Sequence, residues 1–335
     1  MCATTSGLMA RRIGIIGLCI LSVHPALAQS VRFAAIGDLP YNTADERNVD
    51  DVLQDIANSQ SEFIIHLGDI KSGSEYCGND LLDRRLRQLE SSAKPLIYTV
   101  GDNEWTDCHR RPAGGFDPLE RLQWLRKRAF HKPVSLGHTP LAVQQQAILT
   151  DAANTPSENL RWQRGDVLFV TFNIPGSNNN YWAQQEADHP RNAEFATRRA
   201  HNEAWLSDSI SKARAGNVKA VVLAFQGNPF ERDSAEQKSH LRDGFAEWRS
   251  QLASQLKSLG KPTLLLHGDT HAHRIDQSLR DDKGQIVANV LRLETFGFPF
   301  TRNWVEVAVD TSKTLPREVF DIRAKRLLPD DDNKP

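Results

Sequence analysis

Four Gly-Asp dipeptides constrain the fold of this chain more than any other feature, because each directly follows a run of residues that predicts a β-strand. In an open α/β sheet, ligands bind beyond the carboxyl ends of the strands. Glycine lets the backbone turn sharply there, and the following aspartate can point into the crevice. One such pair is equally typical of a solvated turn, so only the repetition points to a site. The four pairs are Gly37-Asp38, Gly68-Asp69, Gly101-Asp102 and Gly268-Asp269; a fifth, Gly165-Asp166, precedes a strand and predicts a turn.

Short β-type runs alternate with amphipathic helical stretches, which predicts an α/β fold. Two helices stand out, over residues 191–213 and 240–259, and Gly260 is expected to end the second. The last third holds more strand than helix, which favours a second sheet packed on the first. No linker or repeat divides the chain, so one domain is expected over 29–328. The predicted strands are 31–36, 62–67, 95–100, 167–173, 218–225, 262–267, 286–293 and 304–309.

The four aspartates would repel one another if they converged at one sheet edge. Two like charges about 4 Å apart repel by roughly 4 kcal/mol at an effective dielectric constant of 20, whereas a whole domain is stable by only about 5–15 kcal/mol. Either a cation binds among the aspartates, or some of them are protonated. Oxygen ligands from several strands favour a metal ion.

The segment 267–273 adds imidazole nitrogen to these oxygen atoms. Asp269 and His271 are two residues apart, so they point the same way if the chain stays extended. His271 is therefore a candidate metal ligand, although a histidine at a strand end is often structural. His273 is either a third donor or a solvated side chain.

The order of these motifs resembles that of the calcineurin-like metallophosphoesterases, and the resemblance runs from residue 31 to residue 309. It rests on the first two Gly-Asp pairs, on Gly101-Asp102-Asn103-Glu104 and on Gly268-Asp269-Thr270-His271. The resemblance implies a four-layer α/β/β/α double-sheet sandwich with two metal ions in a pocket at the strand ends. It also implies hydrolysis of a phosphomonoester or phosphodiester, in which a metal-bound hydroxide attacks phosphorus.

Three positions keep the family's metal ligands. Asp38 matches the aspartate of the first motif, and Asp69 matches the aspartate that bridges the two metal ions. His271 keeps the second histidine of the last motif. The resemblance therefore implies that these three residues are the ligands of one of the two metal positions.

Other positions depart from the family pattern, mostly by exchanging histidine for oxygen ligands. Pro40 stands where the family has a metal-binding histidine, Asp102 replaces a ligand asparagine, and Asp269 replaces a histidine. Gln226 or Asn228 replaces the ligand histidine of the fourth motif. Carboxylate and amide oxygens favour hard ions, so Mn²⁺, Mg²⁺ or Ca²⁺ is expected in preference to Zn²⁺. One or two divalent ions are expected, because Pro40 cannot bind a metal.

Asn103 occupies the place of the histidine that the family is held to use for protonating the leaving group. An amide cannot donate a proton as imidazolium does, and general acid catalysis is typically worth about 10²–10⁴-fold. His109 is the candidate substitute, and His66 and Glu104 are alternatives. Arg110 and Arg111 either bind a substrate phosphate or are ordinary surface arginines.

The first 28 residues have the pattern of a cleaved signal peptide: two arginines, an apolar run and Ala26-Leu27-Ala28. The apolar run of residues 13–23 is short for a bilayer-spanning helix, so an uncleaved anchor is the less favoured alternative. An exported, periplasmic or extracellular protein is expected, with no membrane span after cleavage. Removing the signal leaves Cys77 and Cys108, which form one disulfide or remain as two free thiols. An acidic tail over residues 329–335 is expected to be disordered.

Charge excludes one class of partner. Lys and Arg number 41 and Asp and Glu number 42, so no basic excess exists for dedicated nucleic-acid binding. The expected partner is a small phosphorylated substrate. We therefore expect an exported metal-dependent phosphoesterase. The alternatives are a non-catalytic member of the same fold that binds a metal or a phosphorylated ligand, and a domain that Ca²⁺ only stabilises.

Overall fold

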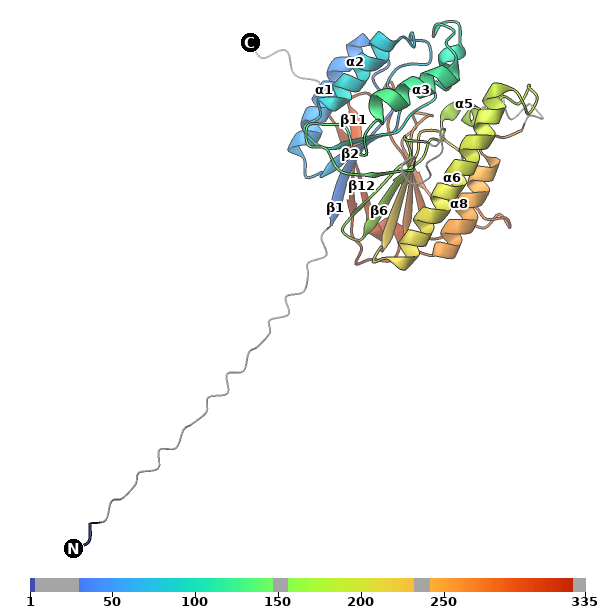
Figure 1. Ribbon diagram of the computed structural model, residues 1–335. Helices are drawn as coiled ribbons and strands as arrows, with labels where there is room; N and C mark the ends of the chain where they lie inside the picture. Colours follow the sequence, from blue (N-terminus) through green and yellow to red (C-terminus); the bar gives the residue numbers. More distant parts are fainter. Residues whose placement is uncertain (4–29, 147–155, 232–241, 328–335) are drawn as a thin grey trace, which may run out of the picture.

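A computed structural model of the chain describes residues 1–3, 30–146, 156–231 and 242–327. The predicted signal peptide and the predicted acidic tail lie outside these ranges, apart from the first three residues of the signal. Two β-sheets stand face to face, and helices cover their outer faces (Figure 1). This arrangement confirms the predicted α/β/β/α sandwich.

The first sheet has five strands in the order β12-β11-β1-β2-β3. Strands β1, β2 and β3 are parallel to one another, while β11 and β12 are antiparallel neighbours on the other side of β1. Parallel strands end at one edge, so the residues after β1, β2 and β3 meet there. The strands are β1 (Val31–Ile36), β2 (Phe63–His66), β3 (Leu96–Tyr98), β11 (Asn303–Val309) and β12 (Phe320–Arg326).

The second sheet has seven strands in the order β4-β5-β6-β7-β8-β10-β9. Its central strands β6, β7, β8 and β10 are parallel, and β4, β5 and β9 pair antiparallel at its two sides. The strands are β4 (Gln144–Gln145), β5 (Leu160–Arg164), β6 (Val167–Thr171), β7 (Ala220–Ala224), β8 (Thr263–His267), β9 (Arg274–Asp276) and β10 (Val290–Glu294).

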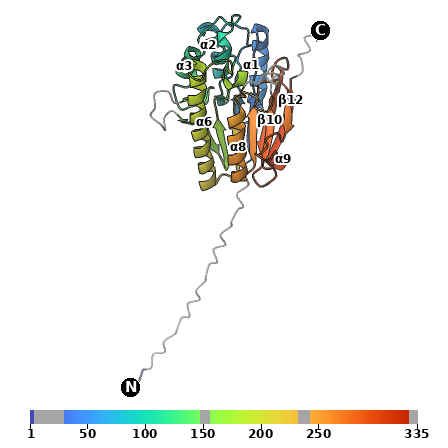
Figure 2. The same cartoon turned by 90° about the vertical axis from the view of Figure 1, so that its right-hand side faces the viewer.

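Helices form the two outer layers (Figure 2). The apolar side of α1 (Thr43–Asn58) packs on the first sheet, and α6 (Pro190–Ala215) and α8 (Ala246–Leu259) pack on the second. Helix α1 begins where the side chain of its N-cap Asn42 accepts a hydrogen bond from Asp45 N, and α8 ends at Gly260 with a φ of 70°. The other helices are α2 (Asn79–Glu90), α3 (Pro118–Ala129), the short turns α5 (Gly176–Asn179) and α9 (Pro316–Val319), and the 3₁₀ helix η1 (Thr106–His109).

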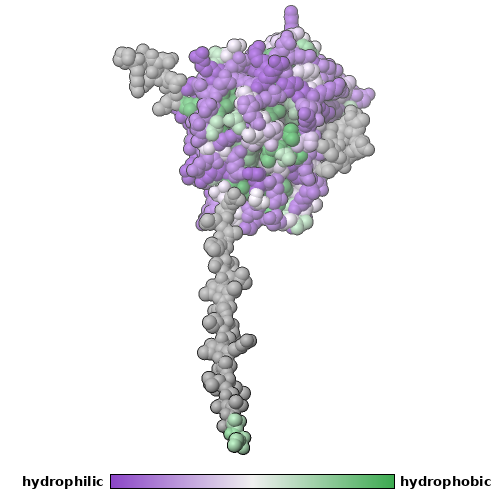
Figure 3. All heavy atoms as spheres, turned by 60° about the vertical axis from the view of Figure 1, so that its left-hand side comes forward, coloured by the Kyte–Doolittle hydropathy of each residue, from purple (hydrophilic) through white to green (hydrophobic). Residues whose placement is uncertain are grey.

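The core between the sheets is built from aromatic side chains of facing strands. Phe33 of β1 meets Phe169 of β6 edge to face with ring centroids 5.5 Å apart, and Phe63 of β2 meets Trp162 of β5 at 5.7 Å. This packing holds the two sheets in a fixed relation. The face seen in Figure 3 is mostly hydrophilic, with hydrophobic side chains exposed over a limited central area.

All eight predicted strands are present, with ends that shift by a few residues, and Gly165-Asp166 forms the predicted turn between β5 and β6. The predicted start of the last long helix is wrong, because α8 begins at Ala246 rather than at residue 240. Residues 240 and 241 lie outside the described ranges. Gly244 N instead donates to Asn178 Oδ1 at 2.7 Å, so the backbone just before α8 is hydrogen bonded to another loop. None of the helices in the described part of the chain combines the length and apolar character needed to span a bilayer.

Candidate functional site

The four aspartates that follow strands meet at one edge of the sandwich; we call Asp38, Asp69, Asp102 and Asp269 the aspartate cluster. Asp269 N donates to both carboxylate oxygens of Asp38, at 3.0 and 3.1 Å. The side-chain amide of Gln226 donates to Asp102 Oδ1 at 3.0 Å and to Asp269 Oδ1 at 3.4 Å. Strand ends from both sheets therefore contribute to a single acidic centre.

Asp69 joins the cluster through Tyr41, a residue that the sequence analysis did not consider. The Tyr41 hydroxyl donates to Asp69 Oδ2 at 3.1 Å and lies 2.9 Å from His271 Nε2. His271 Nε2 in turn lies 3.7 Å from Asp38 Oδ1. Tyr41 is the third residue after Asp38, and this closeness to a motif is the only sequence signal that could have found it.

Burial and mutual repulsion shift the pKa values of these carboxyl groups upward. The pKa of Asp38 lies well above its ordinary value because of desolvation and the nearby charge of Asp269. The pKa of Asp69 is raised well above its ordinary value by desolvation and by the charge of Asp102. Desolvation and Asp102 raise the pKa of Asp269 to about 8. The cluster therefore holds more negative charge than the protein around it compensates.

The donor chemistry of the centre fits a divalent cation. The site combines carboxylates that follow strands of both sheets with His271 Nε2, which lies 3.7 Å from Asp38 Oδ1, and a cation would offset the repulsion that raises the pKa values of the carboxyl groups. In their present arrangement, no three His, Cys, Asp or Glu side chains of the described residues could hold an ion together. The Tyr41 hydroxyl is hydrogen bonded between Asp69 and His271, and the Gln226 amide is hydrogen bonded between Asp102 and Asp269. An ion that binds to these side chains would replace the present hydrogen bonds of both groups.

The cluster is held by strained backbone. Asp38 and Asp69 each have a φ of 55°, Asp269 has 83° and His271 has 59°. Aspartate tolerates this left-handed region better than most residues, but each such residue still costs roughly 1–3 kcal/mol. Strain of this kind persists only where the surrounding structure fixes it, and it is concentrated at functional sites.

The two amide candidates occupy different positions. Gln226 lies in the cluster, and its amide oxygen accepts from Gly176 N at 2.6 Å, so a half-turn of the amide would present that oxygen to a cation. Asn228 N donates to Asp269 Oδ2 at 2.8 Å, but its side chain donates to Thr270 Oγ1 and approaches Glu294. Gln226 is therefore the better placed of the two for metal binding.

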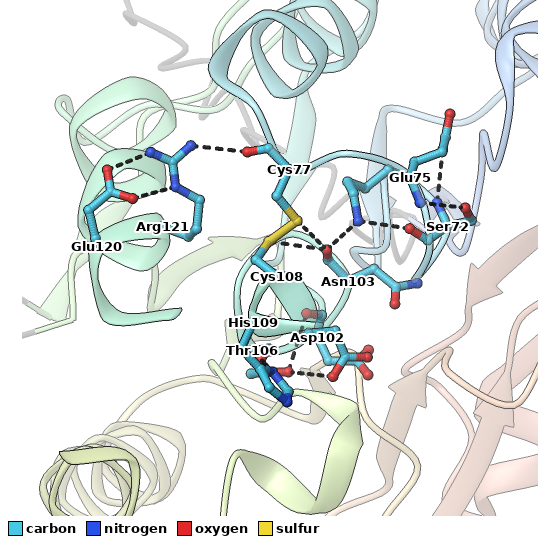
Figure 4. The surroundings of a disulfide bond; sticks show 12 residues. Ser72, Glu75, Cys77, Asp102, Asn103, Thr106, Cys108, His109, Glu120 and Arg121 are labelled. Carbon is cyan, nitrogen blue, oxygen red and sulfur yellow. Dashed lines mark hydrogen bonds and ion pairs between the residues drawn. A yellow bond between two sulfur atoms is a disulfide. The ribbon is translucent and has the colours of Figure 1, made fainter. Parts of the chain in front are cut away.

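Asn103 contacts the cluster directly. Its backbone N–H donates to Asp69 Oδ1 at 3.0 Å and its side-chain amide donates to Asp69 Oδ2 at 2.8 Å. The predicted disulfide between Cys77 and Cys108 is present, and both sulfur atoms approach the Asn103 carbonyl oxygen, at 3.5 and 3.6 Å (Figure 4). Lys71 Nζ donates to the same oxygen at 2.7 Å. The disulfide and the buried lysine thus fix the Asn103 backbone beside the cluster.

The three candidate proton donors have other partners. His109 Nδ1 lies 2.7 Å from Thr106 O, and the ring also contacts Arg191. His66 is fully buried against Leu39 O, and burial lowers its pKa to about 4. Glu104 Oε1 accepts from Asp69 N and Gly101 N, at 3.1 and 2.8 Å, so Glu104 orders the backbone that carries two cluster residues. His66 and Glu104 therefore position the motif loops.

Ser177 and Arg110 form a polar rim beside Asp102. Ser177 Oγ lies 2.7 Å from Asp102 Oδ2 and 2.8 Å from Asp107 Oδ1, and Arg110 Nη2 donates to it at 3.2 Å. Residues 177–180 all have positive φ, between 48° and 61°. Ser177 could not be identified from the sequence, because residue types alone do not show that the chain turns in the left-handed region here.

A methyl group added to Gly73 would lie 2.9 Å from Asn103 Oδ1 and 3.1 Å from Arg110 Nη1. Asn103 Oδ1 and Arg110 Nη1 therefore lie beside the same small space. The Arg110 side chain is 48% exposed and pairs with Asp107 at 2.8 Å, so it faces solvent above the cluster. An incoming anion can contact it there.

Comparison with known proteins identifies the family. The family model described as calcineurin-like phosphoesterase matches residues 31–273. None of the curated proteins compared with the chain matches it. Similar solved structures include a dimetal phosphatase from Danio rerio, with 13% identity, a TM-score of 0.49 and coverage of 87% of this chain and 98% of that one. A phosphatase from Mycoplasma pneumoniae has 14% identity, a TM-score of 0.44 and coverage of 90% and 94%. GAP50, the anchor in the inner membrane complex of Plasmodium, has 13% identity, a TM-score of 0.46 and coverage of 89% of each chain.

The family match spans the first two strand-end motifs, the disulfide-linked loops and the Asp269–His271 segment, and the fold and the converging aspartates agree with it. The chain belongs to the calcineurin-like phosphoesterase family.

Proposed function

We propose that this protein is an exported, metal-dependent phosphoesterase that hydrolyses a phosphomonoester or a phosphodiester outside the cytoplasm. The convergence of four aspartates and His271 at one strand-end edge carries the proposal. Asp38, Asp69 and His271 would hold one ion, and Asp69, Asp102, Asp269 and Gln226 a second. Such ions supply Lewis acidity to the phosphoryl group and to the attacking water.

The protein's own groups bind and orient the ester. In the overall reaction a water oxygen bonds to phosphorus and the water loses a proton to solvent, while the ester P–O bond breaks and the leaving oxygen keeps the bonding electron pair. The Asn103 amide donates to Asp69 Oδ2 and to the Tyr41 hydroxyl, and an amide cannot give up a proton to that oxygen. The leaving group therefore takes its proton from solvent, so esters with good leaving groups should react fastest.

Arg110 is the candidate that binds the substrate phosphoryl group, because its Nη1 reaches the space beside Asn103. Arg110→Met is expected to lower kcat/KM by about 10- to 100-fold, the value of a charge-assisted hydrogen bond. Arg111→Met is the matched control, because Arg111 is the exposed neighbouring arginine of the same loop. Steady-state kinetics on an aryl phosphate measure both. Equal effects of the two substitutions would contradict the assignment of Arg110.

Export is supported by the disulfide, because such bonds persist in oxidising compartments. The predicted signal peptide supports it independently. Hard divalent ions such as Mn²⁺, Mg²⁺ or Ca²⁺ are favoured over Zn²⁺, because four of the proposed side-chain ligands are carboxylates.

The second candidate function is binding of a metal or phosphorylated ligand without turnover. Asn103 in place of the family's histidine favours it, and so does the Tyr41 hydroxyl, which is hydrogen bonded between Asp69 and His271. This protein would then keep the fold and the acidic centre while lacking a proton donor.

One experiment separates the two functions. The purified protein is stripped with a chelator and assayed with p-nitrophenyl phosphate and bis-p-nitrophenyl phosphate after addition of Mn²⁺, Mg²⁺, Ca²⁺ or Zn²⁺. Turnover that returns with metal, and is absent in Asp69→Ala, is the result expected of the enzyme. Calorimetric metal binding without turnover under any ion supports the binding function instead.

A further inference from the structure

The side chain of Phe298 is exposed next to the aspartate cluster, and that of Phe300 is exposed two residues further along the same loop. Phe298 is 40% exposed and Phe300 is 53% exposed, and Pro299 between them is exposed as well. Most other phenylalanines of the described residues are buried in the two hydrophobic cores. We call Phe298 and Phe300 the aromatic patch. An exposed apolar group beside a charged centre is typical of a surface that contacts a ligand.

The aromatic patch reaches the cluster through stacked rings. The ring of Phe298 stacks on that of Tyr41, with centroids 5.7 Å apart and planes inclined by 17°. The Tyr41 hydroxyl lies at Asp69 and His271, and Phe298 N donates to Asp38 O at 3.1 Å. The patch is therefore continuous with the groups that would hold a phosphoryl group.

The loop that carries the two rings is also fixed through its backbone. Main-chain hydrogen bonds hold it, from Phe300 N to Gly297 O at 2.8 Å and from Asn303 N to Phe300 O at 3.0 Å. Burial of a phenylalanine side chain would stabilise the fold by about 1.5–3 kcal/mol, and these two side chains forgo much of that. The exposed rings are thus better explained by what binds to them.

We propose that the aromatic patch binds the organic part of the substrate, so that the preferred substrates are phosphate esters of flat, aromatic groups. The proposal rests on the proposed phosphoesterase function. A phosphoryl group at the cluster would lie near Phe298, whose ring stacks on Tyr41, and its organic group could then contact the exposed rings. Stacking on an aromatic side chain suits any flat ring, because every such ring has a π-face. An aromatic alcohol is also a good leaving group, so its ester can react without the histidine that Asn103 replaces.

The first test measures binding of phosphonates, which have no ester bond to break. Phenylphosphonate and methylphosphonate are titrated calorimetrically into the full chain loaded with Mn²⁺. The wild-type protein is expected to bind phenylphosphonate about 3- to 10-fold more tightly than methylphosphonate. Phe298→Ala and Phe300→Ala should each reduce this preference, and the double variant should abolish it. Leu315→Ala, which removes an exposed apolar side chain at the start of α9, is the matched control and should leave the preference unchanged.

The second test measures turnover of phenyl phosphate and 2-naphthyl phosphate, which differ in ring area. The wild-type protein is expected to have the lower KM for the naphthyl ester, and the double variant is expected to raise that KM with little change in kcat. Phe298→Leu keeps apolar volume without a flat ring, so it separates stacking from general packing, and thermal unfolding confirms that each variant is folded.

A preference for aromatic ligands that survives the double variant would overturn the proposal, and so would an equal loss of affinity for both phosphonates. If the wild-type protein hydrolyses no ester but prefers phenylphosphonate, and the phenylalanine variants lose that preference, the result would support the aromatic patch and refute only the enzymatic function.

Discussion

An Asp102→Asn variant is expected to be more stable than the wild-type protein without metal, and much less able to bind a metal ion. Asp102 adds to the repulsion that raises the pKa values of both Asp69 and Asp269. The asparagine keeps its local hydrogen bonds, because its oxygen can accept from Gln226 Nε2 and its amide can donate to Ser177 Oγ. The Ser177 hydroxyl, whose single proton now has two carboxylate acceptors, is then free to donate to Asp107. Removing one charge without breaking these contacts should stabilise the metal-free fold by about 1–3 kcal/mol.

Metal binding should change in the opposite direction. An ion present at 100 times its dissociation constant stabilises the wild-type protein by about 2.7 kcal/mol. Loss of a carboxylate ligand should remove most of that stabilisation and lower turnover by at least about 100-fold. Urea unfolding with and without Mn²⁺ measures both effects. Asp166→Asn is the matched control, because this fifth Gly-Asp pair lies in the turn between β5 and β6 and bonds to Lys219 and Thr311. A metal-free Asp102→Asn protein that is less stable than the wild type would contradict this account of the cluster.

Removing the disulfide should produce the second large effect. A Cys77→Ala, Cys108→Ala double variant is expected to lose about 3–4 kcal/mol of unfolding free energy, because the bond closes a loop with a sequence separation of 31 residues. Both sulfur atoms lie against the Asn103 carbonyl oxygen (Figure 4), so the loop that carries Asp102 and Asn103 should also loosen. Metal affinity is therefore expected to fall together with stability.

Denaturant unfolding in the presence and absence of a reductant checks the disulfide prediction. The wild-type protein should lose stability when reduced and approach the double variant, whereas the double variant should not respond to the reductant. A stability difference without any change in metal affinity would show that the bond stabilises the fold but does not order the site. Equal stability of oxidised wild type and variant would refute the prediction itself.

The sequence predicts the centre of this protein well, because repetition of one local pattern reports on tertiary structure. Each of Asp38, Asp69, Asp102 and Asp269 follows a buried parallel strand, and parallel strands have one common edge. The strands β4, β5, β9 and β12 were not predicted, because short or charged strands near the sides of a sheet lack the apolar pattern of central ones. Central strands can be predicted because both of their faces are buried.

The polar residues around the cluster could not be predicted in the same way. Tyr41 reaches the site through a loop conformation that no periodicity encodes, and Glu294 at the end of β10 accepts from Ala272 N of a distant loop. The start of α8 was misplaced because Gly244 pairs with Asn178, which is 66 residues away in sequence. A local pattern indicates which residues form a strand or a helix, but distant partners decide where the element begins and how its loops turn.

The left-handed turn over residues 177–180 links the rim of the site to the second helical layer. Asn179 of this turn accepts a hydrogen bond from Arg198 of α6 at 2.6 Å, while Ser177 contacts Asp102 and Arg110. Four consecutive residues in this conformation would relax if those anchors were released, since each costs about 1–2 kcal/mol. A single local opening would therefore separate Ser177 from both Asp102 and Arg110, so hydrogen exchange at these few amides would report how often the polar rim opens in the native protein.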